Sequence, residues 1–185
     1  MGSIFRHLRN VLNQGEPPAE LEPEGLTIRT MTPRDLNAVN AIESVSFGSP
    51  WRPTSYARAI RETRQQFFTA ERHGYIVGYA GFWVEHDMAH IAKVAVHPDY
   101  RRQGIATAML KYLLDQIRRF GLGRAYLEVR RSNAGAQELY RRFGFVFERI
   151  QPHAYPNDGE DAFVLVRNDL LIPAKDDSRN SGAQD

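Results

Sequence analysis

The segment VAVHPDYRRQGIAT, residues 94–107, decides how the rest of the chain is interpreted. It begins with an apolar run that ends at His97-Pro98, which is typical of a buried strand. After a short basic loop, apolar residues recur at helical spacing and predict an amphipathic helix over residues 104–120. The residues of this apolar stripe are Ile105, Met109, Leu113, Ile117 and Phe120. The segment therefore predicts a strand, a loop and the first turn of a helix in direct succession.

The loop between this strand and this helix has the chemistry of a phosphate-binding site. The first backbone N–H groups of a helix have no partners within the helix, and the helix dipole is positive there. Gly104 lacks a Cβ atom and Ala106 is small, so an anion can approach the backbone closely. Arg101 and Arg102 add positive charge at the rim. A surface turn with solvated arginines would contain the same residues, so the segment alone leaves both interpretations open.

Length and composition indicate one globular domain. Core-forming periodicity extends over residues 26–171 of the 185, which is enough for a hydrophobic core. Residues 1–25 are expected to be a flexible leader and linker, and residues 172–185 a disordered tail. No apolar run approaches the length of about 20 residues needed to cross a membrane, and no secretory signal is visible. We therefore expect a cytoplasmic protein.

The absence of cysteine narrows the possible chemistry. Disulfides, thiolate metal sites and a cysteine nucleophile are excluded. His86 and His90 are four residues apart, but they fall in an expected strand and no glutamate follows His86. We therefore expect no metal site.

Positive charge is concentrated in one part of the chain. The formal net charge is +2, but residues 101–142 hold ten of the 24 lysines and arginines and only three of the 22 acidic residues. Such an excess suggests a polyanionic partner, either a phosphate-rich cofactor or RNA. A solvated helix face is the alternative, and it is the simpler explanation for Arg118, Arg119, Arg141 and Arg142.

The remaining periodicities predict a mixed α/β fold. Helices are expected at residues 33–45, 54–62, 104–120 and 134–143, and strands at residues 26–30, 67–71, 75–84, 88–96, 125–129, 145–150 and 162–167. Thr32 with Asp35 can cap the first helix, and Arg72-His73-Gly74 marks a hairpin. The strand at 125–129 follows a helical crossover, so it should run parallel to the strand at 88–96.

The loop and the order of elements resemble the GNAT N-acetyltransferases. The acyl-CoA loop of that family has the pattern Arg/Gln-x-x-Gly-x-Gly/Ala, which Arg101, Gly104 and Ala106 match. The approach to the loop is matched as well, by Val96, Pro98 and Tyr100. The resemblance implies a central mixed sheet of about seven strands flanked by about four helices. It also implies acetyl-CoA as cosubstrate, with no metal.

Other stretches resemble one branch of this family, the RimI type, which acetylates the N-terminal alanine of a small-subunit ribosomal protein. The most specific is Leu127-Glu128-Val129-Arg130-Arg131-Ser132-Asn133, followed by Leu139 to Phe145 and by Ile42-Glu43. Ala154-Tyr155 stands where the branch often has a tyrosine pair, and His153 where it often has a small residue. These departures fall on the side of the presumed acceptor peptide.

Two side chains are candidates for proton transfer. Glu128 shares a strand face with Tyr126 and Arg130, and the resemblance implies that it is the proton acceptor; the alternative is an ion pair with a neighbouring arginine. Tyr140 matches the tyrosine that protonates the leaving thiolate; the alternative is simple packing in an aromatic core with Phe143 and Phe145.

The resemblance also assigns a cofactor site. Backbone groups of Val94, Ala95 and Val96 would pair with the pantetheine as one strand pairs with another. Asn133 would contact the cofactor beside the pantetheine, cap a helix, or do both. The phosphates would be held by Arg101 and by residues 102–107, namely Arg102, Gln103, Gly104, Ile105, Ala106 and Thr107.

Three functions stay open at this point. The first is acetylation of a protein N-terminus, with a ribosomal protein as the expected partner. The second is a GNAT enzyme acting on lysine side chains or small amines. The third is a non-catalytic acyl-CoA or RNA-binding module, although direct nucleic-acid binding is not expected. Phe47 and Trp51 fit either core packing or a mobile loop beside the acceptor site.

Overall fold

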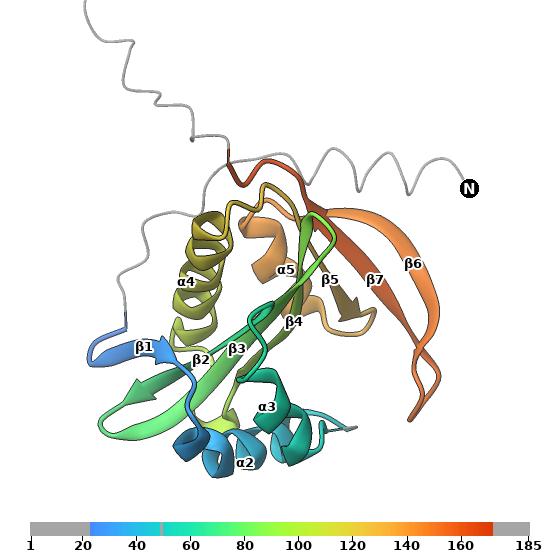
Figure 1. The fold of residues 1–185 in the computed structure, drawn as a ribbon. Helices are drawn as coiled ribbons and strands as arrows, with labels where there is room; N and C mark the ends of the chain where they lie inside the picture. The colour runs from blue at the N-terminus through green and yellow to red at the C-terminus, as the bar shows by residue number, and fades with distance from the viewer. Residues whose placement is uncertain (1–22, 49, 172–185) are drawn as a thin grey trace, which may run out of the picture.

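The computed structural model describes residues 23–48 and 50–171, which form one mixed seven-stranded sheet with four α-helices (Figure 1). The strands are β1 (Leu26–Thr30), β2 (Gln65–Arg72), β3 (Tyr75–Glu85), β4 (Met88–Val96), β5 (Ala125–Arg130), β6 (Val146–Tyr155) and β7 (Glu160–Arg167). The helices are α2 (Leu36–Ser46), α3 (Pro53–Ala59), α4 (Ile105–Arg119) and α5 (Ala134–Arg142). The predicted fold class is confirmed. The predicted tail and all but the last three residues of the predicted leader lie outside the described residues.

The sheet has the order β1-β2-β3-β4-β5-β7-β6, and one of its strand pairs is parallel. Strands β1 to β4 form an antiparallel meander, and β5, β7 and β6 form a second antiparallel group. The two groups meet where β4 and β5 run parallel, as the helical crossover through α4 predicts. This parallel pairing involves only Ala89 with Ala125 and His90 with Tyr126, so beyond these residues the two strands diverge.

Each face of the sheet is covered by its own pair of helices. Phe67 and Phe68 are neighbours on β2, yet they point into different cores because side chains alternate along a strand. Phe67 packs with residues of α2 and α3, whereas Phe68 packs on the face covered by α4 and α5. Within residues 23–48 and 50–171, no helix is both long and apolar enough to cross a membrane.

The turns follow the predicted signals. Thr32 and Asp35 form the predicted capping box, but the helix opens with a 3₁₀ turn (η1, Pro33–Asp35) before α2 begins. His73 and Gly74 both have positive φ angles, as a tight two-residue hairpin turn requires. Gly104 precedes α4 with a φ angle of 76°, a conformation that glycine adopts without strain.

Two predicted ends differ from the structure by three residues or more. Helix α3 ends at Ala59 rather than Glu62, because the amides of Arg61 and Glu62 bond to carbonyls three residues back and tighten the turn. Strand β6 runs to Tyr155 rather than Ile150, passing Pro152 through a shift in register. Proline is tolerated there because β6 is an edge strand and the irregularity absorbs its missing N–H.

Candidate active site

The site is built where β4 and β5 separate. Leu127 and Val129 of β5 pack into the core under α4 and α5, so the alternate residues Tyr126 and Glu128 lie on the opposite face, as predicted. On that face Glu128 Oε2 lies 2.6 Å from His90 Nε2 of β4. The side chains of His90 and Glu128 are 14% and 27% exposed, so the pair is shielded but not sealed from solvent. The structure thus joins Glu128 to a histidine that sequence analysis considered only as a metal ligand.

A bulge explains how β4 presents its polar side chains. Opposite β3, Ile91 pairs with Phe82 and Lys93 with Gly81, so Ala92 has no partner across the ladder. The two glycines of β3 predicted a bend or bulge in this region. Because of the extra residue, His90 and Lys93 both reach the α2–α3 side although they are three positions apart.

The alternative role of Glu128, an ion pair with a neighbouring arginine, is not what the structure shows for Arg130. That guanidinium bonds to Asp158 at 2.8 Å, to Glu160 at 2.6 Å and to Asn157 at 2.9 Å. It also lies 3.9 Å from the centre of the Tyr155 ring. Arg130 therefore binds the β6–β7 turn, and the carboxylate of Glu128 pairs with His90 instead.

Tyr140 is part of the core, as the packing interpretation proposed. Its ring, on α5, lies edge-on to Phe145 with the centroids 5.9 Å apart. Burial raises the pKa of the Tyr140 phenol, so the hydroxyl stays protonated and can act as a donor. Tyr155 of β6 is near enough to both groups to act on them electrostatically: it helps burial to raise the pKa of Tyr140, and Glu128 helps burial to raise the pKa of Tyr155. Packing and proton donation by Tyr140 are compatible with this arrangement.

The edge of β4 that faces β5 is open beyond His90. Val94, Ala95 and Val96 pair with β3 on one side, while β5 has already diverged on the other. The backbone groups on this open side, apart from the Val96 carbonyl that Arg101 occupies, could pair with an extended ligand in the way that one strand pairs with another. This is the position that the family resemblance implies for pantetheine.

The predicted phosphate loop has the expected helix start. The first hydrogen bond of α4 runs from the Ala108 amide to the Gly104 carbonyl, so the amides of residues 105–107 have no partner within the helix. Arg101 folds back, and its Nε donates to the Val96 carbonyl at 3.1 Å. Gln103 accepts a hydrogen bond from Arg72 at 2.6 Å. These two side chains fix the loop, and the amides of the first turn are left to bind an anion.

Asn133 is the predicted helix cap. Its Oδ1 accepts a hydrogen bond from the Ala136 amide at 3.1 Å, at the start of α5. Gln137 of the same helix donates to the carbonyls of Arg130 and Arg131. The end of β5 and the start of α5 are therefore held rigidly beside the point where β4 and β5 separate.

The segment between α2 and α3 is tied to the sheet by a buried glutamate. Glu43 is fully buried and accepts hydrogen bonds from Lys93, Tyr56 and the Trp51 amide. The Trp51 ring stacks on Trp83 of β3, with the centroids 5.7 Å apart. Trp51 therefore packs against the α2–α3 core, and it also lines the basin beside α3. The motif Ile42-Glu43 was visible in the sequence, but its partner Lys93 was not.

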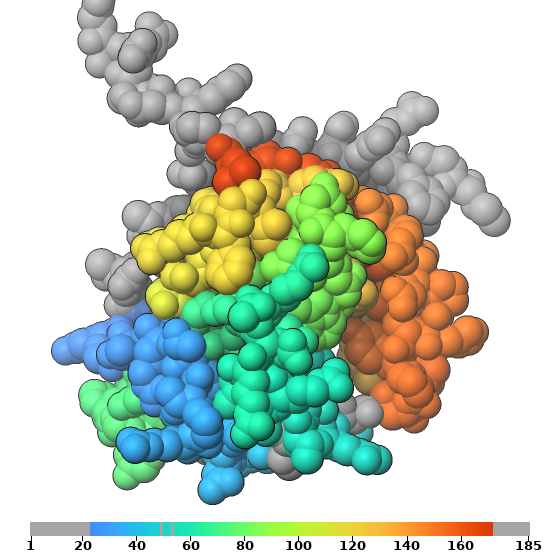
Figure 2. Space-filling model, in the orientation of Figure 1, coloured from blue at the N-terminus to red at the C-terminus, as the bar shows by residue number. Residues whose placement is uncertain are grey.

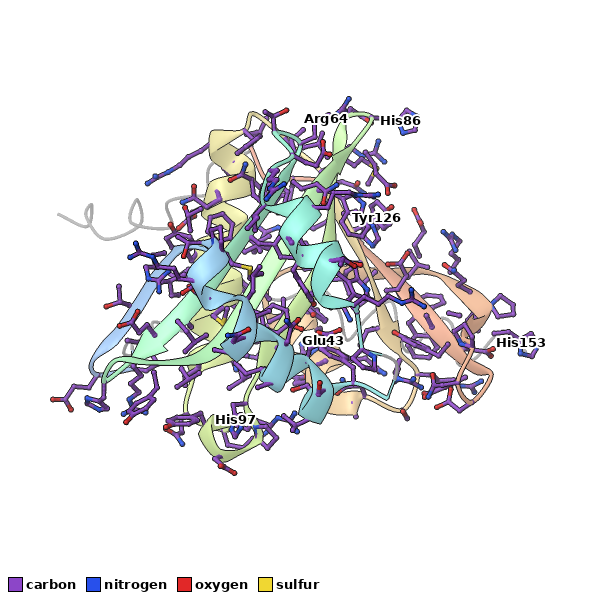
Figure 3. All side chains as sticks on the ribbon, turned by 60° about the horizontal axis from the view of Figure 1, so that its bottom comes forward. Glu43, Arg64, His86, His97, Tyr126 and His153 are labelled. Carbon is purple, nitrogen blue, oxygen red and sulfur yellow. The ribbon has the colours of Figure 1, made fainter. Side chains whose placement is uncertain are left out.

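A basin adjoins this face, between α3 and the turn of the β3–β4 hairpin. Its volume is about 1040 Å³. Figure 2 shows α2 and α3 (blue to teal) beside the β3–β4 hairpin (green), with β6 (orange) beyond it. In Figure 3, Arg64 and His86, which line the basin, lie together at one end, with Tyr126 nearby and His153 far off on the β6–β7 hairpin.

Many charged side chains of residues 101–142 are already paired. In the described structure, Arg118 bonds to Asp115, Arg124 to Asn168 and Arg141 to Glu138. Lys111 and Arg142 also have interactions. This pairing favours a structural role for those residues over an RNA-binding surface. Among residues 23–48 and 50–171, no group of three or more metal-binding side chains occurs.

The seven-stranded mixed sheet that opens between β4 and β5, with a glycine-containing start of α4, is the fold of an acetyl-CoA-dependent N-acetyltransferase. The profile of the Acetyltransferase (GNAT) family matches residues 36–145, and the chain belongs to this family.

Two bacterial relatives are similar over nearly their whole length. The [ribosomal protein bS18]-alanine N-acetyltransferase of Escherichia coli K12 is 36% identical over 142 residues, which cover 76% of this chain and 95% of that protein. The putative [ribosomal protein bS18]-alanine N-acetyltransferase of Bacillus subtilis 168 is 33% identical over 139 residues, covering 75% and 92%. The crystal structure of the ribosomal-protein-S18-alanine N-acetyltransferase from E. coli has a TM-score of 0.73 and 33% identity, covering 82% of this chain and 97% of that chain. The resemblance to this branch is confirmed.

Proposed function

We propose that this enzyme acetylates the N-terminal α-amine of a protein, specifically the N-terminal alanine of a small-subunit ribosomal protein. The observation that carries the proposal is the similarity to the E. coli and B. subtilis enzymes named for that reaction, which spans more than nine tenths of their length. The Leu127–Asn133 string lies within residues 36–145, which match the family profile. A ribosomal acceptor would place the reaction in the cytoplasm.

The cofactor site proposed for this reaction follows the open edge of β4. Val94, Ala95 and Val96 would bind the pantetheine through their backbone. The amides of residues 102–107, with Arg101 fixing the loop, would hold the phosphates at the start of α4. Asn133 would contact the cofactor from the start of α5 while its Oδ1 caps the helix.

Proton transfer is assigned to Glu128, His90 and Tyr140. Acetyl-CoA supplies the acyl group, and a nitrogen–carbon bond forms as the carbon–sulfur bond breaks. Glu128 accepts the proton that the amine must lose, and His90 at 2.6 Å stabilises the carboxylate and shares this proton. An α-amine titrates at about 7.7–8.0, so a modest base is sufficient. Tyr140, whose pKa is raised by burial, donates the proton that the leaving thiolate needs.

Peptide acetylation tests the acceptor. Peptides that begin with alanine and carry a free α-amine should be acetylated at that amine. Matched peptides with a blocked α-amine and free lysines should react at least about tenfold more slowly. The opposite preference would favour lysine acetylation, and no product with any N-terminal residue would contradict the proposal. Mass spectrometry of ribosomal protein N-termini from cells that lack the chain would identify the acceptor.

Two substitutions test the assigned chemistry. Glu128→Gln should lower kcat by about 100-fold or more, within the range of general acid–base catalysis. Tyr140→Phe should lower it by a similar factor and keep the ring in place. If both variants turned over at the wild-type rate, the roles of these residues would be wrong even though the family assignment stands.

A further inference from the structure

We propose that Glu85 is a positioning residue of this active site, which holds His90 in place and stabilises the state in which the His90–Glu128 pair carries the proton taken from the amine. The inference rests on the proposed function of that pair. It concerns a carboxylate at the end of β3, outside the catalytic and cofactor residues assigned above.

Glu85 connects the two aromatic side chains that enclose His90. One carboxylate oxygen accepts a hydrogen bond from Trp83 Nε1 at 2.7 Å, and the other accepts a hydrogen bond from the Tyr126 hydroxyl. Trp83 lies opposite His90 on β3, and Tyr126 lies opposite it on β5. The carboxylate therefore joins strands on either side of β4 at the residue where β4 leaves β5.

The histidine ring is held in one orientation by these neighbours. The Tyr126 ring is parallel to it, with an interplanar angle of 8° and centroids 4.4 Å apart. The Trp83 ring meets it edge-on at 4.6 Å. These two contacts fix the plane of the imidazole, and the hydrogen bond to Glu128 fixes which nitrogen faces that carboxylate, so Nε2 points at Glu128 and Nδ1 toward Glu85.

The charge of Glu85 matters at the second ring nitrogen. His90 Nδ1 is buried and makes no hydrogen bond within the described residues, and Glu85 Oε1 lies 3.7 Å from it. In the neutral ring whose hydrogen is on Nδ1, the Nε2 lone pair faces Glu128 and the ring carries no net charge for Glu85 to attract. The proton that Glu128 takes from the amine can pass to Nε2, which makes the ring an imidazolium whose Nδ1–H faces the carboxylate of Glu85. The attraction between the two charges thus arises only after proton transfer, which is the condition for an interaction to increase kcat.

Glu85 stays ionised in this position. The hydrogen bonds from Tyr126 and Trp83 lower the pKa of its carboxyl group. Burial raises the pKa of Tyr126, so that hydroxyl remains a donor. The charged or titratable groups that face His90 are Glu85 from β3, and Glu128 and Tyr126 from β5. Arg149 on β6 also acts electrostatically on Tyr126.

The expected effect is moderate because Glu85 borders open solvent. Its side chain is 45% exposed and lines the basin between α3 and the β3–β4 turn. Water there weakens the attraction between charges. We therefore expect Glu85→Gln, which keeps the shape and one oxygen acceptor but removes the charge, to lower kcat by about tenfold. The KM values for acetyl-CoA and for the acceptor peptide should change by less than about twofold.

The experiment compares three variants with matched geometry. Asp87→Asn is the control, since Asp87 is a carboxylate of the same hairpin that pairs with Arg124 and not with His90. Tyr126→Phe removes the hydroxyl donor and keeps the stacked ring, and it should lower kcat less than Glu85→Gln does. Thermal unfolding of each variant checks that the fold is retained; if Glu85→Gln does not fold, Tyr126→Phe provides the test and should lower kcat by about threefold at unchanged KM.

Nitrogen NMR of the histidine ring separates positioning from a merely structural role. With ¹⁵N-labelled histidine, and with His90 identified by the signal lost in His90→Gln, Glu85→Gln should move the Nδ1 shift while Asp87→Asn leaves it in place. If neither kcat nor the shift changes in Glu85→Gln while Glu128→Gln is impaired, the inference is overturned and the proposed function stands. If Glu128→Gln and His90→Gln are both fully active, the proposed chemistry itself fails.

Discussion

Glu43 offers a test of how the α2–α3 layer is attached to the sheet. Its carboxylate is fully buried and accepts hydrogen bonds from Lys93 Nζ at 2.9 Å, the Trp51 amide at 2.8 Å and the Tyr56 hydroxyl at 2.9 Å. Lys93 is enclosed as well, with 11% of its side chain exposed and its ammonium 3.9 Å from the centre of the Phe47 ring. Glu43→Gln keeps the shape of the side chain and most of the hydrogen bonding, and it removes the charge opposite Lys93.

The size of the destabilisation by Glu43→Gln follows from the charge of Lys93, which stays buried without its partner. Removing one partner of a buried ion pair costs about 3–5 kcal/mol. The cost is limited because Lys93 can lose its proton instead. Neutralising a lysine with the ordinary pKa of 10.5 at pH 7 costs about 5 kcal/mol, and burial has already lowered the pKa of Lys93. We therefore expect Glu43→Gln to lower the free energy of unfolding by about 3 kcal/mol and Tm by about 10 °C.

The destabilisation should depend on pH in a defined direction. Glu43 raises the pKa of Lys93 and opposes the effect of burial, so without this charge the pKa falls further in the folded state. Between that lowered value and 10.5, the unfolded chain binds more protons than the folded protein. The free energy of unfolding of the variant therefore rises with pH in this window. The loss relative to wild type should be largest at neutral pH and smaller near about pH 9.

Urea unfolding at both pH values measures the effect. Glu62→Gln is the matched control, because Glu62 is an exposed glutamate that follows α3. The double variant Glu43→Gln/Lys93→Met should recover most of the loss, since it removes both charges of the pair. A loss below about 1 kcal/mol in the single variant, or no recovery in the double variant, would refute the reasoning.

Three further changes test local parts of the fold. Arg29 lowers the pKa of Asp35 to about 2 through its hydrogen bonds. The ion pair of Arg29 with Asp35 therefore stabilises the fold fully above the ordinary carboxyl pKa, and this stabilisation is lost as the pH falls through about 2. Asp35→Asn should cost about 1–2 kcal/mol at pH 7, allowing for the 38% exposure of Arg29, and the difference from wild type should vanish near pH 2 in urea unfolding. Gly81→Ala would place a Cβ atom 2.2 Å from Phe67 Cδ1, so Tm should fall by several degrees for a cost of about 2–3 kcal/mol; an unchanged Tm would contradict this packing. Gly104→Ala has room for the methyl group, but the alanine must adopt a φ angle of 76°. The variant should therefore lose about 1 kcal/mol of unfolding free energy and bind coenzyme A more weakly in calorimetry. Equal affinity would show that the loop backbone does not approach the phosphates.

Local patterns in the sequence were sufficient to predict most elements and the glycine-containing helix start that is proposed to hold the cofactor. The apolar stripe from Ile105 to Phe120 predicted α4, because helical spacing places these residues on one face. The alternation in β5 placed Glu128 away from the core for the same kind of reason. The β6 boundary was missed because Pro152 reads as a strand end. A proline is tolerated within β6 only because this strand lies at the edge of the sheet.

The sequence by itself determined the order of the elements and the glycine-containing loop before α4, since each depends on residues within a few positions of one another, and the family resemblance singled out Glu128 and Tyr140 as candidates. The tertiary structure decided which side chains meet Glu128 and Glu43. His90 and Glu128 are 38 positions apart, and Lys93 and Glu43 are 50 apart. Their contacts depend on the parallel register of β4 with β5 and on the extra residue in β4. No local pattern encodes such a register, because it is set by how α4 and the two cores pack against the sheet.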